Sequence, residues 1–399
     1  MREIDIPLLL TTAGLVLLGL LMVNSSTQVE YLQPNTFLQR HFFALTVGVI
    51  LLVLSYIIHF KTFWAFGYII YFLTVVLLAM PLLFSSGSIK RWVSFGGISF
   101  QPSEFAKLGL IIALANLLSN IKFNPQKLSA ICFAFLVFLI PFALTIVEPD
   151  LTTAFILYCI LMGMLLWRNV RTLYILLLVT PLLSIATAFH PVSWIVFIIL
   201  LLTCLVLFRM KFPEILCLFS VNSVIGILTP VFWGSLKGYQ QKRLLSFINP
   251  GSDPKGFGWS IIQSKIAIGS GGLFGKGLFQ GTQKKLSFLP GVHTDFIYSV
   301  ICEEMGFIGS TVVIGLFFIL IYRAIIITKN TKNNFASLLG SGIVSLFLSQ
   351  TLINLGMALG ILPVAGVPLP FISYGGSSLV VSLISVGLLL NIKRRRLFY

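Results

Sequence analysis

Charged residues are scarce in this sequence. Asp, Glu, Lys and Arg make up 10% of its 399 residues, against 57% for hydrophobic residues. An ordinary soluble domain has about 25% charged residues, so this composition excludes a soluble globular protein. The five cysteines lie inside apolar runs without paired spacing, and the four histidines are scattered. The sequence therefore predicts neither a disulfide framework nor a metal site.

Long apolar runs are present instead. Runs of about 17 or more residues recur along the chain, which predicts an all-α polytopic membrane protein with residues 1–399 in a single domain. We count twelve candidate spans, at 7–24, 42–58, 62–84, 104–120, 129–147, 151–167, 172–189, 192–208, 214–236, 296–322, 335–358 and 376–392. The hairpin 172–189 and 192–208 is the least regular, so ten to twelve helices are expected.

The basic residues predict the orientation of the chain. With the N-terminus in the cytoplasm, 15 of the 27 Lys and Arg residues fall in cytoplasmic loops or tails, while the short outer loops hold only Arg40, Lys90 and Arg91. This bias agrees with the positive-inside rule and predicts that both termini are cytoplasmic. It also explains the net charge of +16 without a nucleic-acid partner.

One long outer loop, 237–295, departs from the apolar pattern. It contains eight Lys and Arg residues, eleven glycines and two acids, Asp253 and Asp295. Backbone N–H groups of glycine-rich segments can approach an anion closely, so the loop suits a phosphorylated ligand. Apolar residues at 259, 262 and 266 predict a helix that lies in the membrane interface.

Two interpretations of Asp295 remain open from spacing alone. It precedes an apolar run, where it could cap the following helix. A carboxylate at the edge of a basic loop could equally act as a general base. Glu303 and Glu304 lie about two turns deeper, where acids are expected to face a protein cavity or a partner helix.

Two further polar places lie near the predicted outer face. Glu104 and Lys107 are three residues apart and lie on one helical face. They could form a self-neutralising pair, or they could line a polar pathway. The turn that contains Asp150 and Thr152 could cap the following helix or contribute to a polar cavity.

The last unusual stretch is 360–378, which follows Asn354. Three prolines and several glycines in an apolar setting predict a non-helical re-entrant loop. Such a backbone is tolerated at membrane depth only where protein or water satisfies it, so the loop should lie against the cavity.

Together these motifs resemble the SEDS family of bacterial cell-wall glycosyltransferases. The resemblance is carried, in family order, by 100–107, 148–154, 262–277, 288–297, 303–306 and 360–378. It is strongest to the branch that serves cell elongation, with the division branch as a close relative. The elongation branch is favoured by the short N-terminal tail and by details of the loop.

The resemblance implies a polytopic enzyme of the bacterial cytoplasmic membrane that polymerises lipid II, the undecaprenyl-diphosphate-linked precursor, on the outer face. Asp295 occupies the position of the family's essential aspartate. The implied partners are a class B penicillin-binding protein, which is a transpeptidase, and other rod or divisome membrane proteins. The predicted substrate-binding residues are Glu104, Lys107, Arg243, Lys265, Lys276, His293, Thr294, Asn354 and Ser377.

This resemblance predicts a mechanism. Asp295 would deprotonate the acceptor 4-hydroxyl, and Arg243 and Lys265 would stabilise the leaving diphosphate as the anomeric centre inverts. No cofactor is certain, and the alternative role for Asp295 is to hold a divalent cation, Mg²⁺ or Mn²⁺, at the diphosphate.

The chain departs from the family at two points. Ser287 and Gly291 stand where the family usually has Glu. The family usually has ten spans, so 168–213 would hold an extra transmembrane hairpin. Two rival functions remain, a lipid-precursor flippase or transporter and a non-catalytic scaffold.

Overall fold

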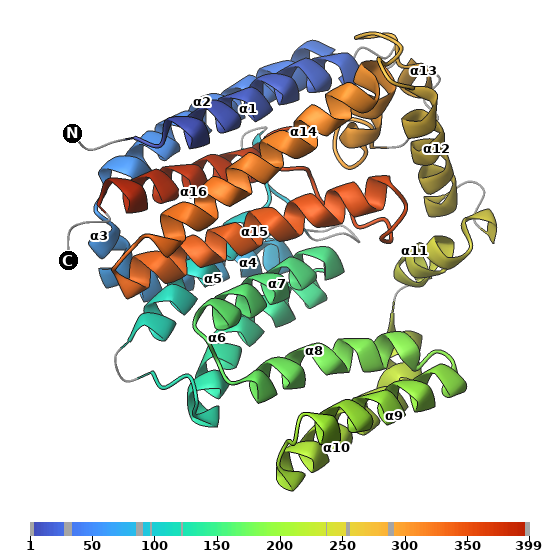
Figure 1. Cartoon of the computed structure of the whole chain (residues 1–399). Helices are drawn as coiled ribbons and strands as arrows, with labels where there is room; N and C mark the ends of the chain where they lie inside the picture. Colours follow the sequence, from blue (N-terminus) through green and yellow to red (C-terminus); the bar gives the residue numbers. More distant parts are fainter. Residues whose placement is uncertain are drawn as a thin grey trace.

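The computed structural model describes residues 4–27, 34–84, 91–95, 98–120, 123–236, 238–252, 256–285 and 291–395. The described chain is almost entirely helical (Figure 1). The helices of the first half are α1 (Ile6–Thr27), α2 (Pro34–Ile57), α3 (Phe60–Ala65), α4 (Gly67–Phe84), α5 (Pro102–Ser119), α6 (Leu128–Val147), α7 (Leu151–Trp167), α8 (Thr172–Thr187) and α9 (Pro191–Leu207). Those of the second half are α10 (Phe212–Ser235), α11 (Gly238–Ile248), α12 (Phe257–Ser270), α13 (Thr282–Lys285), α14 (Ile297–Lys329), α15 (Asn334–Ala358) and α16 (Gly376–Arg394). A short antiparallel hairpin, β1 (Val93–Phe95) and β2 (Ile98–Phe100), precedes α5.

The helices confirm a polytopic membrane protein. Among the described residues, eight helices are long and apolar enough to cross a membrane, namely α1, α2, α5, α6, α10, α14, α15 and α16. Four shorter apolar helices, α4, α7, α8 and α9, occupy the other four expected ranges. The count of twelve spans stays a prediction, since a helix of 16 or 17 residues spans only about 25 Å of a hydrocarbon core of about 30 Å.

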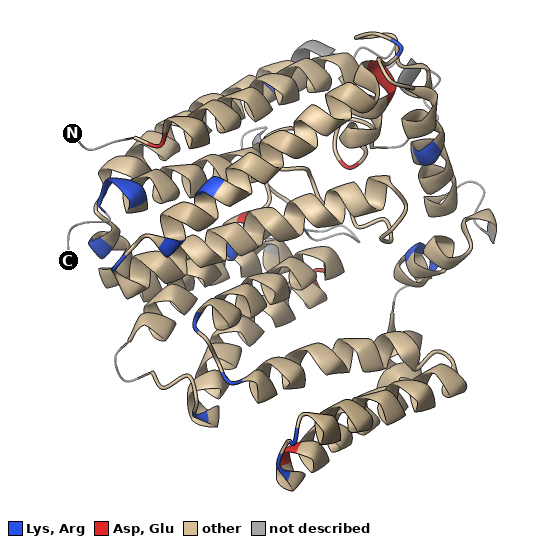
Figure 2. Cartoon of the chain, in the orientation of Figure 1, with Lys and Arg blue, Asp and Glu red and all other residues tan. Residues whose placement is uncertain are grey.

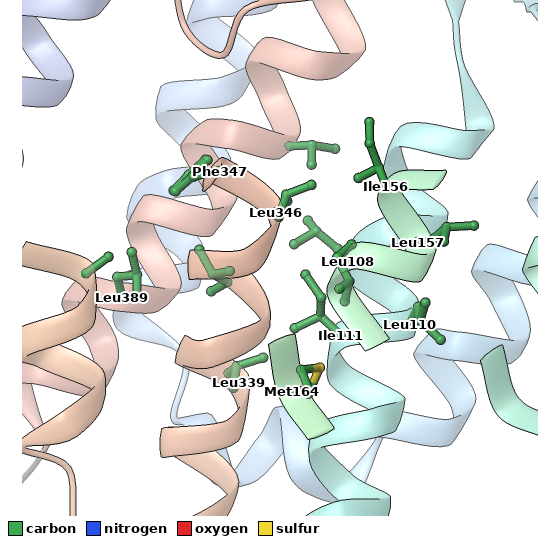
Figure 3. Close-up of a cluster of buried hydrophobic side chains, with 14 of the residues drawn as sticks. Leu108, Leu110, Ile111, Ile156, Leu157, Met164, Leu339, Leu346, Phe347 and Leu389 are labelled. Atoms are coloured by element: carbon green, nitrogen blue, oxygen red, sulfur yellow. The ribbon is translucent and has the colours of Figure 1, made fainter. Parts of the chain in front are cut away.

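The main bundle is built around α15. This helix packs on α14, α7 and α5, while α16 packs along α2 and α4 along α5 (Figure 1). Apolar side chains from α5, α7 and α15 interdigitate in the centre, including Ile111, Ile156 and Phe347 (Figure 3). Gly342 lets α15 approach closely, because a Cβ there would come within 2.5 Å of Ile111.

Helices α8, α9 and α10 form a separate group beside this bundle. They pack on one another, and α8 is joined to the bundle through α7 (Figure 1). The group includes the predicted extra hairpin, 168–213. The structure gives both of its helices, and whether they are additional to the family's spans stays a prediction.

The two ends of the described chain lie together at one end of the bundle. The buried carboxylate of Asp5 pairs with Arg323 of α14 at 2.6 Å and with Lys393 of α16 at 2.7 Å. Burial would raise the pKa of Asp5, but the bonds from Arg323 and Lys393 outweigh it and lower the pKa. Basic positions gather at this end and again along α11 and α12 (Figure 2). A common side for both ends agrees with the predicted topology, in which this side is cytoplasmic.

The segment 238–285 covers the opposite end of the bundle. Within it, α12 runs across the direction of the long helices (Figure 1). Ile262 and Ile266 of α12 are exposed, whereas Ile261 on the other face is buried. This arrangement agrees with the expectation of an interfacial helix.

Candidate active site

Asp295 lies in a tight turn at the covered end of the bundle. The turn begins at Gly291, whose φ of +66° favours glycine, and whose carbonyl accepts hydrogen bonds from the N–H groups of Thr294, Asp295 and Phe296. Phe296 holds the N-cap position of α14, without a side-chain cap bond. The interpretation of Asp295 as the helix cap is therefore wrong, and its carboxylate is available for another role.

The re-entrant segment 359–375 holds this turn in place. Ser373 donates a hydrogen bond to the carbonyl of Thr294 at 2.6 Å, and the N–H of Tyr374 donates to the carbonyl of His293 at 2.8 Å. Asn354 of α15, fully buried, donates to the carbonyls of Asp295 at 3.0 Å and of Val367 at 2.7 Å. The structure thus confirms a non-helical loop that is buried mainly over 367–373, and Asn354 supports the backbone that carries Asp295.

Two arginines provide the positive charge around Asp295. Burial raises the pKa of Asp295 to about 6, against the attraction of Arg243 and Arg91 and a hydrogen bond from Thr294. The guanidinium of Arg243 lies 5.0 Å from the centre of the Phe257 ring, with Nη1 3.4 Å from the carbonyl of Ala365.

The Arg243 guanidinium has a free donor that could bind an anion. Its Nε is buried and has no hydrogen-bond partner. Burial, and then the nearby Arg91, lower the pKa of Arg243, whereas Asp295 raises it. A buried donor without a partner is costly, so an incoming anionic group would be favoured here.

The turn between α6 and α7 forms the adjoining wall. Asp150 accepts hydrogen bonds from Thr153 N at 3.2 Å and from Thr153 Oγ1 at 2.9 Å, which confirms the predicted cap of α7. Arg91 donates to the carbonyls of Glu148 and Pro149, and Tyr239 of α11 donates to the carbonyl of Pro149 at 3.0 Å. The turn therefore joins Arg91 to α11, the helix of Arg243.

Two largely apolar cavities open near this centre. The first, about 480 Å³, lies between α2, α5, α16 and the β-hairpin, and Arg40, Tyr374 and Ser377 line its polar part. The second, about 350 Å³, lies between α7, α11, α15 and residues 362–365, and its lining includes Arg243 and Thr152. Each cavity therefore combines an apolar wall with an arginine.

Glu104 and Lys107 form a buried ion pair on α5. The Nζ of Lys107 lies 2.7 Å from Oε1 of Glu104, and the two residues are 0% and 3% exposed. Pro102 and Ser103 open the helix, and the N–H of Gln101 donates to Ser377 Oγ of α16 at 2.9 Å. The start of α5 thus adjoins the first cavity, whose lining includes Phe105 and Ser377.

Lys276 and Lys265 lie in the covering segment, and no contact in the described structure joins them to Asp295. Lys276 pairs with Glu303 at 2.7 Å, and this glutamate also accepts hydrogen bonds from Thr282. Lys265 is exposed on α12, beside Gly360. Both lysines remain predicted substrate-binding residues at the edge of the site.

Glu303 and Glu304 are almost fully buried against protein, as predicted for acids at this depth. Glu304 accepts hydrogen bonds from Ser25 of α1, at 2.7 Å, and from the N–H of Phe279, at 3.1 Å. The two acids therefore fasten the covering segment to α14 and α1.

His293 points into an aromatic cluster. Its ring centre lies 5.4 Å from that of Phe37 and 5.7 Å from that of Tyr374. Burial lowers the pKa of His293. The lowered pKa favours the neutral imidazole, which can form hydrogen bonds rather than an ion pair.

Sequence analysis did not assign a site role to Arg91 or Arg40. Both are basic residues in short loops assigned to the outer side, where the positive-inside rule disfavours Lys and Arg. Their unexpected position in these loops is the signal that could have identified them. Ser287 lies outside the described residues, as do Lys237, Asp253 and Lys255.

Comparison with known proteins gives a consistent family. The FtsW/RodA/SpoVE family model, described as "Cell cycle protein", matches residues 6–199 and 191–397, two segments that overlap within α9. The chain is 34% identical over 401 residues to a probable peptidoglycan glycosyltransferase FtsW of Trichlorobacter lovleyi, covering 98% of this chain and 93% of the relative. It is 32% identical over 428 residues to the peptidoglycan glycosyltransferase RodA of Treponema pallidum, covering 99% and 98%.

A solved structure supports the same assignment. The fold matches a chain from a peptidoglycan synthase complex with a TM-score of 0.75 and 26% identity, over 99% of both chains. That complex is described as coordinating polymerization and crosslinking. By its sequence and its fold, this chain belongs to the FtsW/RodA/SpoVE family.

Proposed function

We propose that the protein is a peptidoglycan glycosyltransferase that polymerises lipid II on the outer face of the bacterial cytoplasmic membrane. The observation that carries the proposal is a partly buried carboxylate, Asp295, placed near Arg243 and Arg91 at the end of the bundle opposite Asp5. A base, cations for a diphosphate and apolar cavities for lipid chains are what this reaction requires. The names of the relatives supply the same activity.

The reaction follows from the positions of these groups. Asp295 accepts the proton of the acceptor 4-hydroxyl as its oxygen forms a bond to the anomeric carbon of the donor. The bond from that carbon to the diphosphate oxygen breaks, and the electron pair leaves with the diphosphate. Arg243 and Arg91 stabilise the charge on the diphosphate. A single displacement of this kind inverts the anomeric centre.

The two cavities provide places for two lipid-linked substrates. Arg40 is positioned for an anionic headgroup in the first cavity and Arg243 for one in the second. Apolar side chains of α2, including Phe43, Val47 and Leu51, continue the first cavity toward the bilayer. Undecaprenyl chains would extend from these cavities into lipid.

A divalent cation at the diphosphate is the alternative role for Asp295. Within the described ranges, no three His, Cys, Asp or Glu side chains come together as metal ligands. The described protein groups therefore do not form a metal cage of their own, and we derive no step from a cation.

The predicted protein partner is a class B penicillin-binding protein. The support is the matching chain that comes from a peptidoglycan synthase complex. Other rod or divisome membrane proteins are expected as further partners. We assign the chain to cell elongation. Relatives named FtsW and RodA match at 34% and 32% identity, so complementation of strains depleted of each is the deciding test.

Polymerisation of lipid II by the purified protein in detergent tests the function. Wild-type protein should produce glycan chains, with and without its transpeptidase, and Asp295→Ala protein should not. A flippase would produce none, because transport across a bilayer has no meaning in detergent. A scaffold would produce none either and would tolerate Asp295→Asn in cells. Wild-type rates from the Asp295→Ala protein would show that Asp295 is not the base.

A further inference from the structure

The helix group α8–α10 contains a line of polar and aromatic contacts that the proposed reaction does not use. Asn222 of α10 is fully buried in the group. Its Nδ2 donates to Thr180 Oγ1 of α8 at 2.9 Å, and its backbone carbonyl accepts a hydrogen bond from Ser184 Oγ of α8 at 2.8 Å. Trp194 of α9 donates to the same Ser184 oxygen at 3.0 Å. Inside a membrane such interhelical hydrogen bonds join helices that lipid would otherwise separate.

Further contacts join α8 and α9 to α10 at both ends of these helices. At the end assigned to the cytoplasm, Arg171 before α8 pairs with Glu214 of α10. At the opposite end, the rings of Phe189 and Trp233 meet edge to face, 5.0 Å apart. In the middle, Gly226 allows close contact with the Trp194 indole, since a Cβ there would lie 2.2 Å from its nitrogen. The hairpin thus holds α10 along its whole length.

Helix α10 leads directly to the arginine of the site. Only residues 236 and 237 separate it from α11, which carries Arg243. The carbonyl of Trp233 accepts a hydrogen bond from Gln241 Nε2 of α11 at 2.8 Å. Among the described helices, α10 packs closely on α8 and α9 alone, so the main bundle does little to fix it.

We propose that the hairpin α8–α9 is a positioning device that holds α10, and through Trp233 and Gln241 the Arg243 guanidinium, in place for the diphosphate. Asn222 and Thr180 are its central positioning residues. The proposal rests on the proposed function in one respect, the binding of a lipid-linked diphosphate by Arg243.

The test measures lipid II kinetics together with the position of α11. Asn222→Leu and Thr180→Val each remove the side-chain hydrogen bond between Asn222 and Thr180 while largely conserving volume, and the bond from Ser184 to the backbone carbonyl at 222 remains. Each should raise KM for lipid II by about 3-fold or more, the factor that corresponds to one interhelical hydrogen bond, with kcat within about 2-fold of wild type. The double variant should match the single ones, because both substitutions remove one interaction.

The matched control is Ser220→Ala on the exposed side of α10, where the hydroxyl donates to the carbonyl of Leu216 in its own helix. It should leave KM unchanged. Spin labels at exposed residues 245 of α11 and 359 after α15, in a chain without native cysteines, report the position of α11 directly. Their distance distribution should broaden in Asn222→Leu and stay as in wild type in Ser220→Ala.

An unchanged KM, or an unchanged distance distribution, in both Asn222→Leu and Thr180→Val overturns the proposal. An equal change in Ser220→Ala also overturns it, because the effect would then be general to α10. Asp295→Asn, assayed in parallel, separates the two levels. If it abolishes polymerisation while the α10 variants behave as wild type, the proposed function stands and the positioning role fails. If it polymerises normally, the catalytic assignment fails, whatever the labels report.

Discussion

Replacing Asp295 by asparagine conserves the size of the side chain and removes its ability to accept a proton. As the general base, Asp295 should contribute roughly 10²–10⁴-fold to the rate. Lipid II polymerisation by purified Asp295→Asn protein should fall by this factor, mainly in kcat, because the proposed diphosphate contacts of Arg243 and Arg91 would be unchanged. The measurement is the initial rate of glycan formation at saturating lipid II.

The pH dependence provides a second measurement on the same residue. Burial raises the pKa of Asp295 to about 6, so about 10% of the carboxyl is ionised at pH 5, half at pH 6 and about 90% at pH 7. A base acts in its ionised form, so activity should rise about tenfold from pH 5 to pH 7 and then level off. The residual activity of Asp295→Asn should lack this rise.

Stability serves as the control for folding. A folded-state pKa above the ordinary 3.8 means that the ionised carboxylate destabilises the fold, and that this cost is absent below about pH 4 and complete above about pH 6. The shift of about two units corresponds to on the order of 1–3 kcal/mol after allowance for partial exposure. Asp295→Asn should therefore melt at or above the wild-type temperature at pH 7.5.

Three outcomes would contradict the reasoning about Asp295. The first is an Asp295→Asn rate within about threefold of wild type. The second is a wild-type profile that stays flat between pH 5 and pH 7. The third is a clear drop in the melting temperature of the variant at pH 7.5, because the loss of activity would then reflect unfolding.

Three further predictions concern charge in the site. Arg243→Ala should lower kcat/KM for lipid II by about 10²-fold, and Arg243→Lys should restore only part of it, because a lysine lacks the planar guanidinium; equal rates for Lys and Arg would contradict this. Lys107→Met should destabilise the fold by about 3–5 kcal/mol in thermal melts, because Glu104 is left as a buried unpaired charge, and Glu104→Gln combined with Lys107→Met should recover most of it. If Asp295 acts as a base without a cation, polymerisation should survive EDTA, and a loss that Mg²⁺ or Mn²⁺ reverses would instead favour the cation role.

The transmembrane helices could be predicted because they depend on the length and hydrophobicity of local runs in the sequence. Each apolar run must form a helix to satisfy its backbone in lipid, and the runs at 129–147 and 335–358 match α6 and α15 within about one residue. The re-entrant loop after Asn354 could be predicted for the complementary reason, since its prolines cannot continue a helix.

The site could be predicted only in part. Spacing could not decide between a cap and a base for Asp295, because both roles require a carboxylate just before a helix. The turn at Gly291 excludes the cap, because it moves the cap position to Phe296, and the base role stays a prediction. The grouping of Arg91 with Arg243 depends on contacts between segments about 150 residues apart, which no local pattern specifies.

The expectation for the lysines was the least specific. Glycine-rich sequence next to Lys265 and Lys276 suggested that both reach an anion, but the glycines serve backbone contacts. Gly275 has a φ of +80°, and a Cβ there would meet the Glu304 carbonyl at 2.1 Å. Close packing of backbone and close approach of a phosphate require the same residue, so the sequence alone cannot separate them.

The contact between segment 271–277 and α14 should slow the exchange of amide hydrogens in this segment. Gly306 interrupts α14 with a φ of +64°, and the N–H groups of Phe307 and Ile308 bond to carbonyls at 272 and 273. In return, the N–H groups of Lys276 and Gly277 bond to the carbonyls of Glu303 and Glu304. A surface segment would ordinarily exchange its amide hydrogens within seconds, but these amides can exchange only when the membrane helix itself opens. The amides of this part of the cover should therefore exchange as slowly as those of the helix bundle. Substrates would then enter beside segment 271–277 rather than through it.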